Sequence, residues 1–279
     1  MSVSTSGLMQ DEELAMITKE LFDLSGKVAL ITGGSRGLGL QMAEALGDMG
    51  ARVAISARKQ NELDNASSYL TAKGIDVLTI VNDLGGDASS KPEETLVSAV
   101  MDRFGAVDIL INNAGMVWGG VAIDLTPENW NKVMALNVDA CFRVAQVVAR
   151  KSMIPRKSGK IINISSIAGL GGPRPDGDIF AVAYNTSKGA LITLTQALAT
   201  ERGKYNINVN ALCPGYFPTK LSAGLAQAAA GIAKVTPIGR VGGEHDIKGA
   251  AVFFASEASR HITGQALAID GGGSAVILN

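Results

Sequence analysis

The sequence has few of the residues that build disulfide frameworks or metal sites. Its 279 residues include two cysteines, Cys141 and Cys213, and two histidines, His245 and His261. Two cysteines do not make a disulfide framework, and we interpret both as small buried hydrophobes in a reducing compartment. The histidines are far from any cysteine cluster, so the spacing typical of a metal site is absent. We predict a cytoplasmic protein without a bound metal.

Charge of one sign and long apolar runs are also missing. The formal net charge is -1, which favours neither nucleic acid nor an anionic membrane as a partner. No apolar run approaches the length of a membrane-spanning helix. The N-terminal region lacks the basic and unbroken apolar parts of a secretory signal. We expect an N-terminal extension over residues 1–22, helical over 12–22, followed by one catalytic domain over 23–279.

The chain is instead rich in apolar runs, with hydrophobic residues making up 47% of it. Runs that resemble strands alternate with helical segments, and strands are expected near 27–31, 51–56, 75–81, 107–111, 159–164, 206–213 and 266–269. This alternation predicts an α/β fold, a single Rossmann-type doubly wound domain with a seven-stranded parallel sheet and helices on both faces. Ligands of such sheets bind outside the carboxyl ends of the strands.

A glycine-rich turn follows the first expected strand. Gly33, Gly34, Gly37 and Gly39 lie between that strand and a helical pattern. Glycine allows a tight reversal and close approach to a pyrophosphate, while N–H groups at a helix start attract the anion. The G-x-x-x-G-x-G spacing differs from the commoner dinucleotide pattern. A plain strand-to-helix turn is the alternative, and the alternation that follows favours phosphate binding.

Tyr184 and Lys188 are four residues apart in an expected helix, so phenol and ammonium share one face. A neighbouring cation favours the phenolate and lowers a phenol pKa from its usual value of about 10. Tyr184 is therefore a candidate general acid/base. An isolated pair of this kind is more often a coincidence on a surface helix, so the interpretation depends on the other motifs.

Taken in order, the motifs resemble those of the short-chain dehydrogenase/reductases. They are residues 32–39, residues 112–115, the serine pair 165–166, the Tyr184–Lys188 pair and the dipeptide 214–215. Five motifs in order are far more specific than any one of them. The resemblance covers roughly residues 22–273 and implies an NADP(H)-dependent oxidoreductase of a small-molecule carbonyl or alcohol substrate. It also implies a homotetramer.

The resemblance implies four catalytic residues. Ser166 would orient the substrate carbonyl, and Tyr184 would protonate its oxygen as hydride arrives. Lys188 would lower the tyrosine pKa and bond the nicotinamide ribose. Asn137 would hold a water that links Lys188 to solvent, with a structural hydrogen bond as the alternative. Ser166 is preferred to Ser165 because it directly precedes the Ile-Ala-Gly segment.

The charges at the end of the second expected strand predict which nicotinamide cofactor binds. Relatives that use NAD carry an acid at the end of the second strand, and this chain has Ala57 there. Arg58 follows it and Arg36 lies in the glycine turn, so two guanidinium groups could bind a 2′-phosphate. A solvated surface role is the alternative for Arg58. We expect NADP(H).

The resemblance extends to the remaining contacts of the cofactor. It places Asp83 near adenine, although a turn aspartate is the alternative, and Thr219 near the carboxamide, although a helix N-cap is the alternative. The implied cofactor-binding residues are Gly33, Ser35, Arg36, Gly37, Leu38, Gly39, Arg58, Asp83, Leu84, Asn113, Gly115, Tyr184, Lys188, Pro214, Gly215, Phe217 and Thr219.

Two segments are expected on the substrate side. One is the long Gly- and Pro-rich stretch around 170–180. Its charges Arg174, Asp176 and Asp178 are interpreted as solvated, with contact to a polar substrate as the alternative. The other is a helical lid over 220–237, whose apolar face suits an acyl chain. Within the family, the sequence is most similar to 3-oxoacyl-thioester reductases, including the rhamnolipid-associated type, and to gluconate 5-dehydrogenases. Both stay open, as does a remote alternative, a nucleotide-binding regulator without catalysis.

Overall fold

The computed structural model describes residues 17–172 and 180–276. Residues 20–22 form a single 3₁₀ turn, and most of the helix expected over 12–22 lies outside the described residues. The three charges of the 170–180 stretch also lie outside them. The proposed boundary at residue 22 stays a prediction.

Seven parallel strands form one sheet, as the alternation of apolar runs predicts. In space their order is β3-β2-β1-β4-β5-β6-β7. The strands are β1 (Val28–Thr32), β2 (Arg52–Ala57), β3 (Val77–Val81), β4 (Ile109–Asn112), β5 (Gly159–Ile164), β6 (Ile207–Pro214) and β7 (Ala266–Ile269). The order reverses between β1 and β4, which pair directly. In such sheets, ligands bind where the order reverses.

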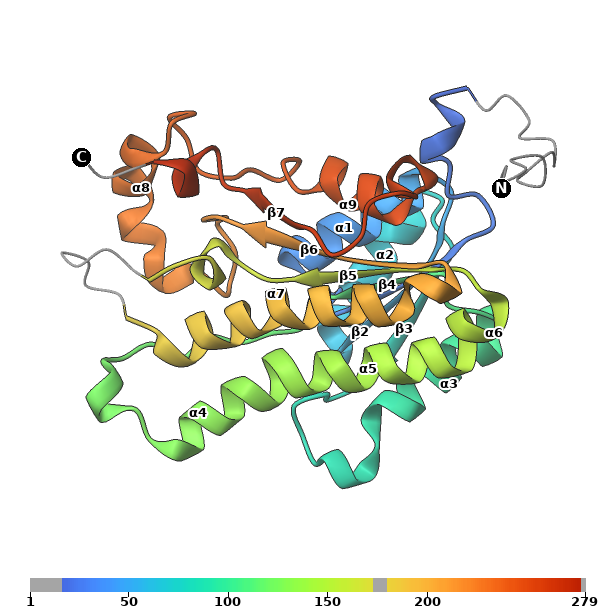
Figure 1. Ribbon diagram of the computed structural model, residues 1–279, viewed down its shortest axis with the longest axis horizontal. Helices are drawn as coiled ribbons and strands as arrows, with labels where there is room; N and C mark the ends of the chain where they lie inside the picture. Colours follow the sequence, from blue (N-terminus) through green and yellow to red (C-terminus); the bar gives the residue numbers. More distant parts are fainter. Residues whose placement is uncertain (1–16, 173–179, 277–279) are drawn as a thin grey trace, which may run out of the picture.

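Helices cover both faces of the sheet (Figure 1). They are α1 (Gly37–Asp48), α2 (Gln60–Ala72), α3 (Pro92–Phe104), α4 (Pro127–Met134), α5 (Ala140–Val148), α6 (Ile154–Arg156), α7 (Val182–Arg202), α8 (Ala229–Val235) and α9 (Lys248–Ala255). Side chains alternate along β1, so Ala29 and Ile31 pack with α1, α2 and α9, while Val28 and Leu30 pack with α3, α5 and α7. The predicted doubly wound fold is confirmed.

The helix expected around Asn137 departs from regular geometry at that residue. α4 and α5 are joined by a π-helical segment, Ala135–Asp139, which contains Asn137. Such segments are rare and occur frequently at functional sites. Across the ranges 17–172 and 180–276, no helix has both the length and the apolar character needed to cross a membrane.

Candidate active site

The carboxyl ends of β1 and β4 are fastened together by two side chains. The Thr32 hydroxyl accepts the N–H groups of Asn113 and Ala114, both at 3.0 Å. The Asn113 amide donates to the carbonyls of Thr32 and Gly33 at 2.9 and 3.0 Å. These bonds fix the glycine turn against the residues after β4, so the floor of the site is preorganised. Sequence reasoning assigned no side-chain role to Thr32.

The glycine turn is too closely packed for larger residues. Gly33 and Gly37 have φ of +65° and +53°, which L side chains rarely adopt. A Cβ on Gly39 would lie 2.4 Å from the Gly33 carbonyl oxygen, and one on Gly34 would lie 2.6 Å from Ile55 Cγ2. α1 then begins without a side-chain hydrogen bond at its N-cap. Its first N–H groups are therefore available to an anion.

Charged residues gather where β2 ends. The Gly34 N–H bonds the Ser56 carbonyl at 3.1 Å, which brings the glycine turn to this strand end. Arg36 Nη1 donates to Glu62 Oε1 at 2.9 Å. Arg58 is exposed and forms no ion pair with a residue that the structure describes. The two arginines singled out from the sequence thus border the same strand end, and Glu62 beside them was missed.

The serine pair at the end of β5 divides between two environments. The Ser165 hydroxyl donates to the Lys188 carbonyl at 2.7 Å, which binds β5 to α7. The Ser166 hydroxyl accepts the Ala168 N–H at 3.1 Å and lies 3.4 Å from the Pro214 carbonyl oxygen. Ser165 therefore has a structural partner in the helix, while Ser166 lies at the start of the 3₁₀ turn Ile167–Gly169.

The Lys188 ammonium is buried beside the Tyr184 ring. Only 4% of Lys188 is exposed. Its Nζ donates to the Ile164 carbonyl at 2.8 Å and lies 5.5 Å from the centroid of the ring. An ammonium has three donors, so one bond holds it in place while others can serve a ligand. The spacing predicted from the sequence therefore places the two groups on one face of α7.

Asn137 is fully buried and its side chain bonds protein groups. Its Oδ1 accepts the Met116 N–H at 2.8 Å, and its Nδ2 donates to the Met116 carbonyl and to Ser187 Oγ, both at 2.9 Å. A Cβ on Gly115 would lie 3.3 Å from Asn137 Oδ1 and 3.5 Å from Lys188 Nζ. The structural hydrogen bonds considered as an alternative are therefore present. The water relay stays a prediction.

The segment at the end of β6, residues 214–219, lies against the glycine turn. A Cβ on Gly37 would lie 3.4 Å from Thr219 Cγ2. Ser222 Oγ donates to the Phe217 carbonyl at 2.6 Å and accepts the Thr219 N–H at 2.8 Å. Phe217 is buried. This hydrogen-bonded turn brings the end of β6 and the start of the expected lid to the same opening as the glycine turn.

Two residues expected near adenine follow β3. Asp83 accepts the Gly85 N–H at 3.1 Å, which is the local turn considered as an alternative. Leu84 is buried, and its carbonyl accepts a bond from Arg143 at 3.3 Å. The contact with adenine stays a prediction for both residues.

Comparison with known proteins decides the family. The sequence model of the family described as short chain dehydrogenase matches residues 27–230. The chain belongs to the short-chain dehydrogenase family. It is thus an oxidoreductase that acts on CH–OH or C=O groups, and the resemblance noted in the sequence is confirmed.

Three similar proteins illustrate the range of this family. Gluconate 5-dehydrogenase of Gluconobacter oxydans (strain 621H) is 39% identical over 91% of this chain and 96% of its own length. The 3-oxoacyl-(acyl-carrier-protein) reductase of Escherichia coli (strain K12) is 35% identical over 90% of this chain and 98% of its own. The structure of a gluconate 5-dehydrogenase from Burkholderia cenocepacia J2315 with NADP and tartrate has a TM-score of 0.85 at 35% identity, covering 94% of this chain and 100% of that one.

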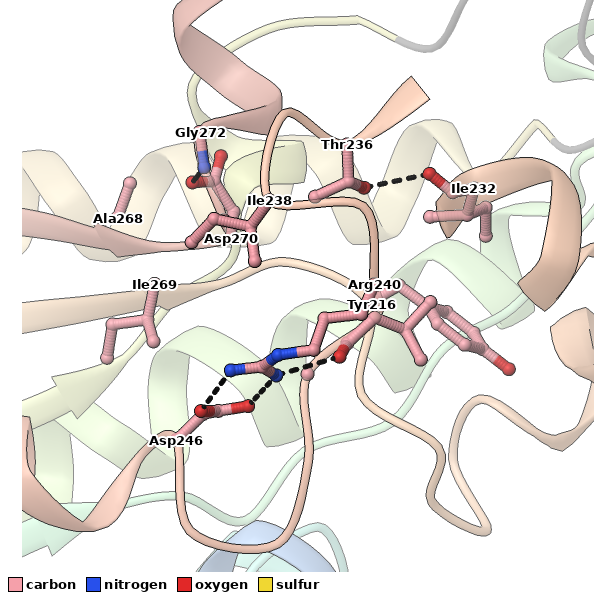
Figure 2. A pocket seen from close by; sticks show the side chains of 13 residues that line it. Tyr216, Ile232, Thr236, Ile238, Arg240, Asp246, Ala268, Ile269, Asp270 and Gly272 are labelled. Atoms are coloured by element: carbon pink, nitrogen blue, oxygen red, sulfur yellow. Dashed lines mark hydrogen bonds and ion pairs between the residues drawn. The ribbon is translucent and has the colours of Figure 1, made fainter. Parts of the chain in front are cut away.

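This short-chain dehydrogenase also has a cavity that sequence reasoning missed. Its volume is about 340 Å³, and it lies between α8, the 236–246 loop and the end of β7. Figure 2 shows Arg240 and Asp246 pointing toward one another at one side of it. Hydrogen bonds from Arg240 and from the Gly243 N–H lower the pKa of Asp246 to about 2. None of the four expected catalytic residues lines this cavity.

Both cysteines of this short-chain dehydrogenase are buried and free. Burial raises the pKa of the Cys141 thiol to about 11, and it also raises the pKa of Cys213. A thiolate is the reactive form, so the raised pKa disfavours reaction at both residues. This agrees with their interpretation as buried hydrophobes.

Proposed function

We propose that this short-chain dehydrogenase reduces a ketone with NADPH, the ketone being a 3-oxoacyl thioester or a related carbonyl. The observation that carries the reaction is the buried Lys188 ammonium, held by the Ile164 carbonyl beside the Tyr184 ring. A fixed cation at a phenol stabilises the phenolate left after proton transfer. Ser166 completes the set. The Ser165 hydroxyl bonds the Lys188 carbonyl, so the next residue, Ser166, lies where the end of β5 meets the helix of Tyr184 and Lys188.

The four side chains have distinct tasks in the proposed reaction. NADPH, when bound, supplies hydride to the carbonyl carbon. The Ser166 hydroxyl donates a hydrogen bond to the carbonyl oxygen and orients it. Tyr184 gives that oxygen its proton, so the ketone becomes a secondary alcohol. Lys188 stabilises the resulting phenolate until a proton returns from solvent, and Asn137 belongs to that return path.

The residues at the cofactor side fit a dinucleotide with a 2′-phosphate. The glycine turn has positive φ at Gly33 and Gly37, and the uncapped start of α1 offers N–H groups to a pyrophosphate. At the end of β2, Ala57 replaces the acid that would repel a 2′-phosphate, while Arg36 and Arg58 offer positive charge. The relative crystallised with NADP supports the same choice.

Apolar residues lie on the loops that flank the start of α7, the helix that carries Tyr184. The Gly120 N–H bonds the Phe180 carbonyl at 2.8 Å, and Asn185 Nδ2 bonds the Gly171 carbonyl at 3.2 Å, so two loops flank the start of α7. Exposed apolar side chains on these loops and at the helix start are Val117, Trp118, Val121, Ile123, Leu170, Phe180 and Val182. Such a rim suits an acyl chain better than a polyol.

A sugar-acid or polyol dehydrogenase is the second candidate. The observation that favours it is the 39% identity to a gluconate 5-dehydrogenase, compared with 35% for the 3-oxoacyl reductase. A regulator without catalysis is a third, remote candidate. The retention of Asn137, Ser166, Tyr184 and Lys188 in the sequence argues against it.

Steady-state oxidation of NADPH and NADH tests these candidates. The panel holds acetoacetyl-CoA, longer 3-oxoacyl thioesters, 5-ketogluconate and simple diketones. We expect NADPH turnover that is fastest with the thioesters. A preference for 5-ketogluconate would establish the second candidate instead, and tight NADPH binding without turnover would favour the regulator.

A further inference from the structure

The Glu62 carboxylate on α2 lies close to cationic side chains from three segments of the chain. Glu62 lies in the first turn of α2 and is paired with Arg36 of the glycine turn at 2.9 Å. Lys59, just before α2, lies at 3.8 Å from the same oxygen, and Lys220, at the start of the expected lid, lies at 3.7 Å. The segments that carry Arg36 and Lys220 are far from α2 in the sequence, so tertiary structure brings these charges together.

This cluster lies where a 2′-phosphate would bind. The Gly34 N–H bonds the Ser56 carbonyl, so the turn that carries Arg36 meets the end of β2. Arg58 follows β2 directly. Glu62 therefore holds one of the two guanidinium groups that a 2′-phosphate would require.

The pairing has a cost that depends on the cofactor. A phosphate and a carboxylate compete for the same guanidinium donors, because both accept the same charge-assisted bonds. A carboxylate beside the site also repels a phosphate, whereas it repels a ribose hydroxyl far less. Arg36 is about half exposed, with 48% of its side chain accessible, and ion pairs at exposed sites are weak enough to exchange readily.

We propose that Glu62 is the resident counter-ion of Arg36 and so limits the preference of this enzyme for NADPH over NADH. The inference rests on the proposed use of NADP(H). Glu62 acts through Arg36 rather than on the reacting atoms, so it is a specificity-determining residue. Arg36 leaves Glu62 when a 2′-phosphate arrives, and the carboxylate remains as a nearby negative charge.

The test is direct titration of the purified protein with NADPH and NADH, followed by nicotinamide fluorescence at low ionic strength. Glu62→Gln should lower the Kd for NADPH about three- to tenfold, which is roughly 0.7–1.4 kcal/mol. The Kd for NADH should change less than about twofold. The gain should shrink in high salt, since salt screens exposed charges.

Asp64→Asn is the matched control. Asp64 lies on the same helix, and its substitution removes the same charge. Its carboxylate accepts a bond from Gln60 rather than from Arg36. Its two nucleotide affinities should stay within about twofold of the parent. A double-mutant cycle adds Arg36→Gln, whose cost for NADPH binding should be larger in the Glu62→Gln background. Thermal unfolding of each variant verifies the fold.

Three results would overturn the inference. If Glu62→Gln left the Kd for NADPH unchanged or raised it, while the parent bound NADPH tightly, this inference would fail and the proposed function would stand. Weakened NADH binding in that variant would show that Glu62 bonds the ribose hydroxyls instead. A parent protein that binds neither nucleotide would overturn this inference and the proposed function together.

Discussion

Lys188 illustrates how a charge can be kept inside this protein. Burying an ammonium is costly unless hydrogen bonds and opposite partial charges replace water. The Ile164 carbonyl accepts one of its bonds, and the Tyr184 ring lies 5.5 Å from Nζ. Removing either partner would therefore affect the chemistry and the local packing at once, so tests at this site need conservative changes.

Tyr184→Phe is such a change. It keeps the ring beside Lys188 and removes the hydroxyl that would donate the proton. Turnover should fall by on the order of 10²–10⁴-fold, the usual contribution of general acid catalysis, while the NADPH Kd stays within about twofold. Steady-state kinetics and fluorescence titration measure the two effects. Tyr205→Phe, which removes a hydroxyl elsewhere, is the control, and retained turnover in Tyr184→Phe would exclude Tyr184 as the acid.

The buried thiol of Cys141 gives a prediction about stability at high pH and about labelling. Burial raises the pKa of Cys141 to about 11, above the value of about 8.5 expected in an unfolded chain. The unfolded state therefore loses this proton first, and the Cys141 contribution to stability is complete below about pH 8.5 and is lost as pH rises toward 11. Iodoacetamide at pH 8 should leave Cys141 unlabelled in the native protein and label it after denaturation. Rapid labelling of native protein would contradict its burial.

At the scale of elements, the π-helical segment Ala135–Asp139 connects α4 and α5 to the loop after β4. The Asn137 side chain makes this connection by hydrogen bonds to the N–H and the carbonyl of Met116, and it also bonds Ser187 on α7. The adjacent Gly115 passes close to two side chains of the site, since a Cβ there would lie 3.3 Å from Asn137 Oδ1 and 3.5 Å from Lys188 Nζ. The Asn137 amide thus holds the Met116 part of the loop that borders the proposed cofactor site.

Asn137→Ala should therefore destabilise the fold as well as slow the reaction. It removes three hydrogen bonds and leaves polar groups of Met116 unpaired, for a loss of about 2–4 kcal/mol in the free energy of unfolding. Denaturant titration measures the loss, and hydrogen exchange should show faster exchange of the Met116 amide. Ser187→Ala, which removes one of those bonds, should cost about 1 kcal/mol. Equal stability of Asn137→Ala and the parent would refute this role.

At the scale of the whole molecule, the sheet has two edge strands, β3 and β7. β7 carries exposed apolar residues, including Leu267 at 40% exposure. Exposed strand edges of this kind favour pairing with another chain. The homotetramer implied by the family resemblance stays a prediction, and the β7 edge is a surface on which it can be tested.

Leu267→Lys should weaken the assembly because it places a charge on that apolar edge. We expect the parent to have the mass of a tetramer in light scattering after gel filtration, and the variant to form smaller species. Val81→Lys makes a similar change on the opposite edge strand and should leave the mass unchanged. A parent that is monomeric at micromolar concentration would disprove the predicted tetramer.

Much of this protein follows from its sequence. Apolar runs are local signals, so the seven strands fall within about two residues of their expected positions, an error usual for element boundaries. The helical spacing of Tyr184 and Lys188 likewise fixes that both groups share one face of α7. The glycine turn was readable because positive φ and close approach restrict the residue type.

The tertiary structure alone decided which distant side chains meet. Glu62 with Arg36 and Lys220, Thr32 with Asn113, and the cavity beside β7 all join segments separated in the chain. The π-helical geometry at Asn137 likewise accompanies hydrogen bonds to Met116 and Ser187. Such contacts carry no periodic signal, because the packing of helices on the sheet determines them and the spacing of residues along the chain does not.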